Sequence, residues 1–343
     1  MSKTSILNAP VPPGSLVLVT AANGLVASHV ADQFLTAGYR VRGTVRNKSK
    51  NEWLTSLFDA RYGNGRFELM EIPDIFAPDA WIAAVKDVAG IAHVFGAADV
   101  YTQDFEAAAE KEFPSHIALL EAARNESTVK SFVFTSSAWA ASSPVANKKR
   151  TLTEWSWNED DIALARSDAS PEQKYFANYM ALKSLLEQRI WGWVKKEKLP
   201  FSFNTILLST VFGPTLHPKD QGMPSTAGMV KWAFDGINTQ ILAIMPPQWC
   251  VDTRDAGMLY VAALTTPGVS GERLFAFGDR YSWAKVIEIL GKLFPGKDLP
   301  SLPDSGWDQT EVPNLRSGEL LNGVKQSTWT SLEESVKAGS QCF

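Results

Sequence analysis

The stretch LVLVTAANGLVASHVADQFL, residues Leu16 to Leu35, decides the fold of the first half of the chain. It begins with the apolar run of a buried strand, and Val26–Ala37 has the apolar spacing of a helix. Between them lies TAANGLVA, Thr20 to Ala27, which has the length and the small residues of a nucleotide-binding turn. The turn holds one glycine, Gly24, where such turns usually hold two or three.

The glycines of such a turn have separate tasks, and the spacing G-x-x-G-x-x-G falls here on Ala21, Gly24 and Ala27. The middle glycine lets the backbone approach a pyrophosphate, and alanine is allowed at the third position. Alanine at the first position is a departure, because a Cβ there costs ~1 kcal/mol if φ is positive. The alternative is a strand–turn–helix unit whose small residues serve packing alone.

Strand-like and helix-like segments alternate beyond this turn. The expected strands are Leu16–Thr20, Arg40–Val45, Phe67–Ile72, Ile91–Val94, Ser131–Ser136 and Ser202–Leu208. The expected helices are Val26–Ala37, Lys50–Tyr62, Glu106–Asn125 (with a breaker at Pro114) and Glu172–Lys198. This alternation predicts an α/β protein with a doubly wound parallel sheet covered on both faces by helices.

The alternation weakens after Gly213, where GPTLHPKDQGMPSTAG is expected to be a loop. Pro295 to Arg316 is also loop-like. Helices are expected at Met229–Asp235, Asp255–Leu264, Ser282–Phe294 and Ser331–Val336. We therefore divide the chain into a nucleotide-binding domain, residues 1–208, and a smaller, mainly substrate-binding part, residues 209–343, with segments that return to the first domain.

Composition excludes several classes of protein. The 343 residues are 45% hydrophobic and 20% charged, as in ordinary globular proteins, and the net charge of −4 gives no reason to expect nucleic acid or a membrane as partner. Two cysteines and four scattered histidines provide no disulfide framework and no metal-site spacing. No apolar run approaches the ~18 residues of a membrane span, and the N-terminus lacks a signal peptide's apolar core. We expect a soluble, cytoplasmic monomer or homodimer without a metal.

The strand after the turn, in YRVRGTVRNKSK, ends without an acidic residue. An acid at that place would bind the ribose hydroxyls of NAD and repel a 2′-phosphate. Arg46 stands there instead, followed by Lys48 and Lys50. This cluster favours NADP, and the alternative is a solvated basic loop.

Tyr179 and Lys183, in KYFANYMALKSLLEQRIW, are four residues apart and share one face of an expected helix. A second pair with this spacing, Tyr281 and Lys285, occurs in DRYSWAKVIEIL. Ser282 is expected to cap the helix there, so Tyr281 would precede the helix and would not face Lys285. The first pair is therefore the candidate for chemistry.

The segment SFVFTSSAWAASS predicts a buried strand that delivers Ser136 and Ser137 at its carboxyl end. Ligands bind at the carboxyl ends of strands in an open α/β sheet. Trp139, two residues further on, is expected on the same side. The alternative is that the two hydroxyls only cap the strand end.

The stretches LVTAANGLVASHV, VRGTVRNKSK, KSFVFTSSA, YMALKSLLE and ILAIMPPQWCVDTRDAG together resemble the extended short-chain dehydrogenase/reductase family, over residues 12–340. They are most similar to the branch of NADPH-dependent fungal and yeast carbonyl reductases and plant dihydroflavonol and cinnamoyl-CoA reductases. The resemblance implies a Rossmann fold. It also implies that the protein reduces a ketone or aldehyde to the alcohol by hydride transfer from NADPH, and the aromatic residues of the expected pocket, described below, indicate a bulky one.

The resemblance also implies roles for single residues. Tyr179 would protonate the carbonyl oxygen, Lys183 would favour the ionised tyrosine and hold the nicotinamide ribose, and Ser137 would hydrogen-bond the same oxygen. Arg46 and Lys50 would bind the 2′-phosphate, Asp74 and Ile75 would flank adenine, and Val211 would face the nicotinamide amide. The implied NADP contacts are Thr20, Ala22, Asn23, Gly24, Leu25, Val26, Arg46, Lys50, Asp74, Ile75, Thr135, Tyr179, Lys183, Leu208 and Val211.

The substrate pocket is predicted from aromatic and small residues, because the chain has twelve tryptophans and aromatic rings often line sites for apolar ligands. The candidates are Ala98, Val100, Trp139, Tyr175, Trp232 and Trp249. For any single tryptophan other than Trp139, the alternative is a place in the core or at its edge.

Three residues depart from the family pattern. Ala21 replaces the first glycine, Phe95 stands where the family has a small residue, and Leu208 replaces a common proline. They support an alternative function, a non-redox dinucleotide-binding or tailoring protein that has lost hydride transfer. The complete set of Ser137, Tyr179 and Lys183 favours the reductase.

Overall fold

The computed structural model describes residues 9–77, 79–96 and 102–343. Within these residues, seven parallel strands form the central sheet in the order β10-β7-β5-β4-β1-β2-β3. The strands are β1 (Leu16–Val19), β2 (Arg40–Val45), β3 (Phe67–Glu71), β4 (Val88–His93), β5 (Ser131–Ser137), β7 (Ser202–Leu208) and β10 (Arg273–Ala276). The order reverses beside β1, so the predicted doubly wound parallel sheet is confirmed.

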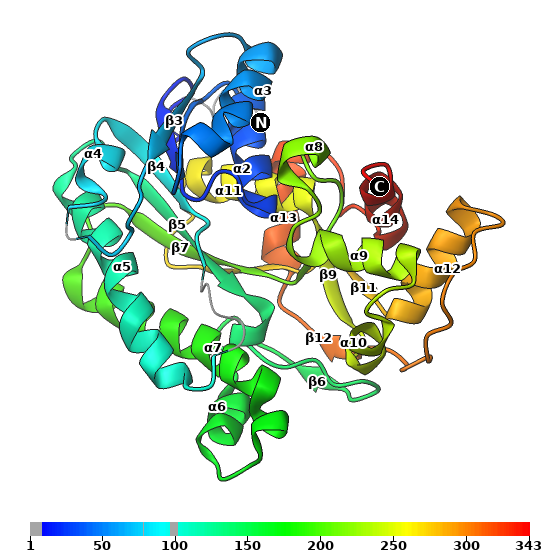
Figure 1. The fold of residues 1–343 in the computed structure, drawn as a ribbon. Coiled ribbons are helices and arrows are strands. Elements are labelled where there is room, and N and C mark those ends of the chain that lie inside the picture. Colours follow the sequence, from blue (N-terminus) through cyan, green and yellow to red (C-terminus); the bar gives the residue numbers. More distant parts are fainter. Residues whose placement is uncertain (1–8, 78, 97–101) are drawn as a thin grey trace.

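Helices cover both faces of this sheet, as Figure 1 shows. One face packs against α2 (Leu25–Thr36), α3 (Glu52–Tyr62), α11 (Thr253–Thr265) and α13 (Leu315–Lys325). The other packs against α4 (Ile82–Val85), α5 (Phe105–Asn125) and α7 (Pro171–Glu197). Gly257 lets α11 approach α2 closely, because a Cβ there would lie 2.8 Å from the carbonyl oxygen of His29.

The remaining elements gather mainly on the right in Figure 1. Three strands in the described part of the chain pair in the order β11-β9-β8. They are β8 (Thr210–Phe212), β9 (Gln248–Asp252) and β11 (Asp279–Tyr281). The helices with them are α8 (Pro218–Gln221), α9 (Ser225–Asp235), α10 (Thr239–Ile244), α12 (Trp283–Leu293) and α14 (Leu332–Ser340). Phe212, Tyr281, Trp283 and Val336 lie in the separate apolar core of this part.

The chain also contains short elements. The 3-10 turns η1 (Ser49–Asn51) and η2 (Ala138–Ala140) lie in the first part. The strand β6 (Arg150–Thr151) of the first part pairs with β12 (Thr310–Glu311) of the second. The helix α6 (Glu159–Arg166) packs beside α7 through Ile162 and Leu186. Among the described residues, no helix combines the length and the apolarity needed to cross a bilayer.

Several local expectations are corrected. The helix α5 continues through Pro114, and the expected loop after Gly213 contains α8 and the first turn of α9. No helix was expected at Glu159–Arg166 or Leu315–Lys325, where α6 and α13 lie. The strand β10 returns from the second part to pair with β7. The central sheet therefore includes a strand from beyond residue 208. The division of the chain at this residue remains a proposal about which part binds the nucleotide and which binds the substrate.

Candidate active site

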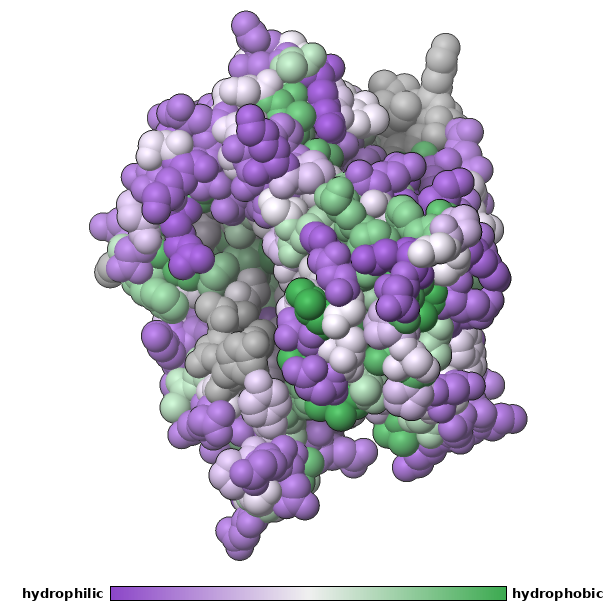
Figure 2. All heavy atoms as spheres, turned by 45° about the vertical axis from the view of Figure 1, so that its right-hand side comes forward, coloured by the Kyte–Doolittle hydropathy of each residue, from purple (hydrophilic) through white to green (hydrophobic). Residues whose placement is uncertain are grey.

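A cavity of about 540 Å³ lies at the carboxyl edge of the central sheet. The turn after β1, the ends of β2, β4 and β5, the helix α7, and the start of β8 all contribute to its wall. Figure 2 shows that one face of the molecule is hollowed. The cavity is lined by Ala21, Gly24, Leu25, Val26, Ala27, Arg46, Val94, Phe95, Gly96, Thr135, Ser136, Ser137, Ala138, Trp139, Tyr179, Lys183, Leu208, Ser209, Thr210, Val211, Ser225 and Thr226.

The turn after β1 has the backbone shape that the first-glycine position was expected to need. Ala21 has φ of +52°, in the left-handed region that glycine adopts more readily. The amide of Gly24 donates to the carbonyl of Ala21 at 2.9 Å, which closes the turn. Gly43 on β2 makes room behind it, because a Cβ there would lie 2.7 Å from the Cβ of Ala22. The turn is thus held tightly against β2 despite the alanine.

The helix α2 begins directly at this turn. Gly24 is its N-cap and supplies no side-chain hydrogen bond to the first turn. The amides at the start of a helix lack intrahelical acceptors, and they favour an anion such as a phosphate group. Leu25 and Val26, the first two residues of α2, line the cavity. A pyrophosphate there could therefore accept hydrogen bonds from the backbone alone.

The three candidate catalytic residues meet in the cavity. The Ser137 hydroxyl oxygen accepts a hydrogen bond from the backbone N–H of Trp139 at 3.2 Å, so its own proton remains available to a ligand. The Lys183 ammonium lies 5.5 Å from the centre of the Tyr179 ring. A Cβ on Gly96 would lie 3.1 Å from this ammonium, so the small residue leaves room for the lysine.

The second Tyr-x-x-x-Lys pair has a structural role. Tyr281 ends β11, is fully buried, and shares a hydrogen bond of 3.2 Å with Thr210; burial raises its pKa. Ser282 caps α12 by accepting from the amide of Lys285, as expected. Lys285 pairs instead with Glu288 at 2.9 Å. The two members of this pair therefore do not act together.

The implied cofactor residues divide into two groups. Gly24, Leu25, Val26, Arg46, Thr135, Tyr179, Lys183, Leu208 and Val211 line the cavity. Thr20 and Ala22 are buried behind the turn, and Asn23 is exposed. Lys50, Asp74 and Ile75 lie beyond the cavity wall, on η1 and on the segment after β3.

Of the substrate-pocket candidates, Trp139 lines the cavity. Tyr175 is exposed and packs edge-on against Phe176, Trp232 packs against the second part's core, and Trp249 packs against Phe277. Ala98 and Val100 lie outside the described residues. The lining residues that were not predicted from the sequence are Ser209, Thr210, Ser225, Thr226, Val94, Gly96 and Ala138. The first two directly follow β7, so their place at a strand end was a usable signal.

A second, apolar cavity of about 230 Å³ shares Trp139 with the first. Its wall includes Phe176, Met180, Ile244 and Met245. The Trp139 ring stands edge-on to Tyr179, with ring centres 5.7 Å apart. Trp139 therefore lies between the candidate proton donor and an apolar space large enough for part of a ligand.

A buried carboxylate connects the elements beneath the catalytic residues. Glu187 lies one helical turn beyond Lys183 on α7, and its Oε2 accepts a hydrogen bond of 2.7 Å from the hydroxyl of Ser136. Arg273 of β10 pairs with the same carboxylate at 2.9 Å. The strand that carries Ser137 and the helix that carries Tyr179 are thus joined by one charged group.

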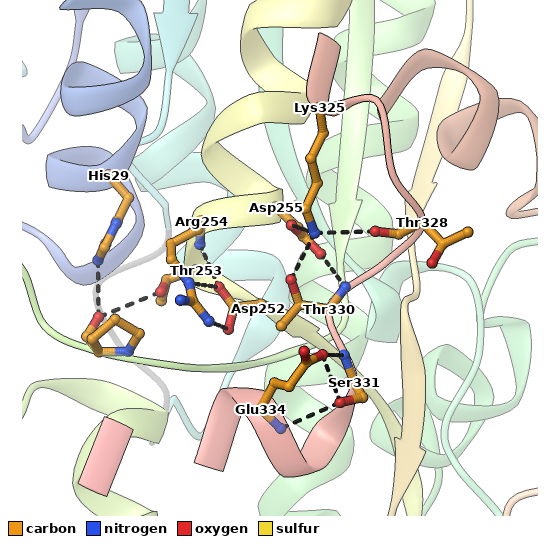
Figure 3. A network of polar contacts seen from close by, with 11 residues as sticks. His29, Asp252, Thr253, Arg254, Asp255, Lys325, Thr328, Thr330, Ser331 and Glu334 are labelled. Carbon is orange, nitrogen blue, oxygen red and sulfur yellow. Dashed lines mark hydrogen bonds and ion pairs between the residues drawn. The ribbon is translucent and has the colours of Figure 1, made fainter. Parts of the chain in front are cut away.

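A separate hollow of about 640 Å³ lies among α11, α13 and α14. Two of the basic residues that line it are paired, Lys325 with Asp255 and Arg254 with Asp252, both at 2.7 Å (Figure 3). The amide of Thr330 donates to Asp255 at 2.6 Å. None of the candidate site residues lines this hollow, so its contacts serve to attach α11 to the C-terminal segment.

Known proteins with similar sequences belong to the family that the sequence motifs indicated. The sequence model of the NAD dependent epimerase/dehydratase family matches residues 17–238. Aldehyde reductase 2 of Sporidiobolus salmonicolor is 35% identical over 333 residues, which cover 96% of this chain and 96% of that protein. Ketoreductase adrE of Penicillium rubens is 37% identical over 348 residues, which cover 98% of each.

Solved structures share the fold. The crystal structure of yeast methylglyoxal/isovaleraldehyde reductase Gre2 complexed with NADPH matches with a TM-score of 0.77 and 22% identity, covering 95% of this chain and 97% of that one. Vestitone reductase from alfalfa matches with a TM-score of 0.75 and 20% identity, covering 96% and 97%. At these identities the likeness establishes the architecture.

Proposed function

Because this chain belongs to the NAD dependent epimerase/dehydratase family, the extended short-chain dehydrogenases/reductases, we propose that it reduces a bulky ketone or aldehyde to the alcohol with NADPH. One observation carries the proposal. Ser137, Tyr179 and Lys183 line the same cavity as the nucleotide-type turn and Arg46. Proton donor, cation and dinucleotide groups therefore converge at one edge of the sheet.

The residues present suit a dinucleotide. Gly24 keeps the backbone open at the pyrophosphate position, where a Cβ would lie 3.3 Å from the Ala21 carbonyl oxygen. Arg46 reaches the cavity from the end of β2 and offers a planar fork to a 2′-phosphate. When bound, the nicotinamide supplies the hydride.

The protein's own task is to polarise the carbonyl group and to supply a proton. The hydroxyl oxygen of Ser137 accepts a hydrogen bond from the amide of Trp139, so its own proton is free to form a hydrogen bond to the carbonyl oxygen of the substrate. Tyr179 transfers its phenolic proton to that oxygen as the hydride adds to the carbon, which leaves a neutral alcohol. Lys183 stabilises the phenolate that remains.

The shape of the site supports a bulky substrate. The carbonyl end would lie by Tyr179, and the apolar remainder would extend past Trp139 toward Phe176, Met180 and Met245. Burying apolar atoms in such a space contributes ~25 cal/mol per Å². The two relatives named as reductases agree with carbonyl reduction and leave the substrate open.

The test is a titration with NADPH followed by fluorescence, and then NADPH oxidation over a panel of aromatic and β-keto carbonyl compounds. We expect saturable binding and turnover with at least one bulky carbonyl. Tight binding with no turnover on any compound would contradict the proposal and favour the non-redox alternative. All three departures from the family pattern, Ala21, Phe95 and Leu208, line the cavity.

The first prediction is a preference for NADPH over NADH on the order of 10²-fold in kcat/KM. Two charge-assisted hydrogen bonds to a 2′-phosphate contribute ~1.5–3 kcal/mol each before discount for solvent and salt. In Arg46→Ala this preference should fall sharply, through weaker NADPH binding and with NADH binding unchanged. It should also shrink as ionic strength rises. Equal kcat/KM for the two cofactors in the wild type at low salt would contradict this prediction and support the alternative that Arg46 belongs to a solvated basic loop.

The second prediction concerns the alanine in the turn. Ala21→Gly should keep NADPH binding or tighten it by at most ~1 kcal/mol, because it removes a Cβ from a residue with φ of +52°. The measurement is the dissociation constant of NADPH by fluorescence, with Ala27→Gly as the control inside α2. A clear loss of binding in Ala21→Gly would mean that the turn requires the Cβ, and the cofactor placement would be wrong.

A further inference from the structure

Two of the four histidines, which are scattered in the sequence, contact each other in the core. Nε2 of His93 lies 2.8 Å from Nδ1 of His116. Nδ1 of His93 lies 3.0 Å from the hydroxyl of Thr20, and Nε2 of His116 lies 3.3 Å from Oε1 of Glu112. All four side chains are buried. We call Thr20, His93, His116 and Glu112 the histidine network; it begins behind the cofactor cavity and ends on α5.

The contacts of Thr20 fix the direction of every hydrogen bond in this network. Its oxygen accepts from the backbone amides of Val94 at 2.9 Å and Phe95 at 3.0 Å, so both lone pairs are used. The hydroxyl must then donate its proton to Nδ1 of His93. A neutral imidazole with an acceptor Nδ1 carries its proton on Nε2, so His93 donates to His116.

The same logic continues to the end of the network. His116 accepts at Nδ1, so it too carries its proton on Nε2 and donates to Glu112. Each imidazole nitrogen is then used, and neither histidine has a lone pair left for a metal. Among the described residues there is no cluster suited to hold a metal ion. A carboxylate at the end of such a series strengthens the bonds before it.

The environment of His93 keeps it neutral. Burial and the neighbouring His116 hold the pKa of His93 well below its usual range. The groups packed around its ring are aromatic, namely Trp81, Phe95, Phe132 and Phe134, and His116 is the titratable group that faces it. A proton on Nδ1 of His93 would remove the acceptor that Thr20 uses.

The network holds one wall of the cavity. Val94, Phe95 and Gly96 follow β4 directly and line the cavity, and Gly96 borders Lys183. Two amides of this wall are bonded to the single oxygen of Thr20. If Thr20 turned its proton toward the wall, one amide would lose its acceptor.

We propose that His93, His116 and Glu112 are positioning residues, which orient the Thr20 hydroxyl so that the Val94–Gly96 wall is fixed for the cofactor. The inference rests on the proposed function only for its effect on NADPH. The direction of the hydrogen bonds and the order of the wall are properties of the protein itself. They can be measured without any cofactor.

The first test is ¹⁵N NMR of the histidine side chains in the full-length protein, with His93→Gln and His116→Gln to assign the signals. We expect the proton on Nε2 of both rings at pH 8, as the hydrogen bonds require, and we expect His93 to stay neutral down to pH 6. A proton on Nδ1 of either ring at pH 8, or titration of His93 between pH 8 and pH 6, would overturn the proposal. This result does not depend on whether the protein binds NADPH.

The second test compares Glu112→Leu with Glu112→Gln. Glutamine keeps an oxygen that accepts from His116, and leucine does not. Leucine leaves the buried Nε2–H of His116 without an acceptor, and one such donor corresponds to about a tenfold change in an equilibrium constant. We therefore expect Glu112→Leu to raise the dissociation constant of NADPH and the KM for NADPH about tenfold. The kcat at saturating NADPH should be unchanged, and Glu112→Gln should behave as the wild type.

Amide hydrogen exchange gives a readout that needs no cofactor. The amides of Val94 and Phe95 should exchange faster in Glu112→Leu and at the wild-type rate in Glu112→Gln. Glu110→Gln, an exposed change on the same helix, is the control for altered charge on α5. Equal behaviour of the leucine and glutamine variants in exchange and in KM would refute the role of the network. Altered exchange without NADPH binding in the wild type would refute the proposed function alone.

Discussion

Tyr179→Phe is expected to lower kcat by ~10²–10⁴, because a general acid contributes a factor of this size. NADPH binding should change little, since the ring is kept and only the hydroxyl is removed. Trp139, which packs edge-on against Tyr179, keeps its contact in the variant. The measurements are single-turnover NADPH oxidation and a fluorescence titration of the cofactor. A variant that retains most of the wild-type rate would exclude Tyr179 as the proton donor.

Tyr281→Phe is the matched control for this experiment. It removes the same atom from the other Tyr-x-x-x-Lys pair, where Tyr281 is buried, does not line the cavity and bonds through its hydroxyl to Thr210. We expect near wild-type turnover and a loss of ~1 kcal/mol in unfolding free energy. Equal loss of turnover in both variants, or a greater loss in Tyr281→Phe, would show that the choice between the two pairs was wrong.

The sequence predicted the central sheet and the three catalytic candidates for the same reason. The strands β1, β5 and β7 contain apolar runs bounded by polar or small residues, and the carboxyl ends of parallel strands share one edge of the sheet. Tyr179 and Lys183 share a helix face at a spacing of four. Local sequence patterns were therefore enough to predict that Ser137, Tyr179 and Lys183, from separate segments, lie near one edge of the sheet.

Elements that depend on distant partners escaped the sequence reading. The strand β10 contains Arg273, a charged residue that is buried because Glu187, 86 positions away, pairs with it. The histidines were expected to form no metal site because they are scattered in the sequence, and nothing in the sequence indicated that His93 and His116 meet between β4 and α5. No local periodicity reports such a contact. The sequence likewise did not predict which groups surround the side chains of Phe95 and Leu208, both of which line the cavity.

The Glu187–Arg273 pair carries the largest expected effect on stability. Both side chains are fully buried, and two hydrogen bonds of 2.9 Å join the guanidinium to the carboxylate. Arg273 also donates to the carbonyls of Glu154 and Ser156, and its guanidinium lies 3.8 Å from the centre of the Trp157 ring. Removing one partner leaves a buried charge without compensation.

Arg273→Met should therefore lower the unfolding free energy by ~3–5 kcal/mol, measured by urea denaturation. Glu187→Leu should have a similar cost, because it leaves Arg273 unpaired and the hydroxyl of Ser136 without its acceptor. The double variant should lose less than the sum of the two single losses, because no buried charge remains in it. The surface pair Arg166–Glu106, which is exposed, should contribute at most ~1 kcal/mol in the same cycle.

The Glu187 and Arg273 single and double variants also show whether this pair stabilises the fold alone or positions the catalytic residues as well. Ser136 precedes Ser137 on β5, and Glu187 follows Lys183 by one turn on α7, so the pair fixes how the strand and the helix lie together. If the double variant folds, its kcat should remain below that of the wild type, because the apolar pair restores packing energy without the hydrogen bond from Ser136. A double variant with additive losses in unfolding free energy would show that the two charges act independently, and one with wild-type kcat would show that the pair serves stability alone.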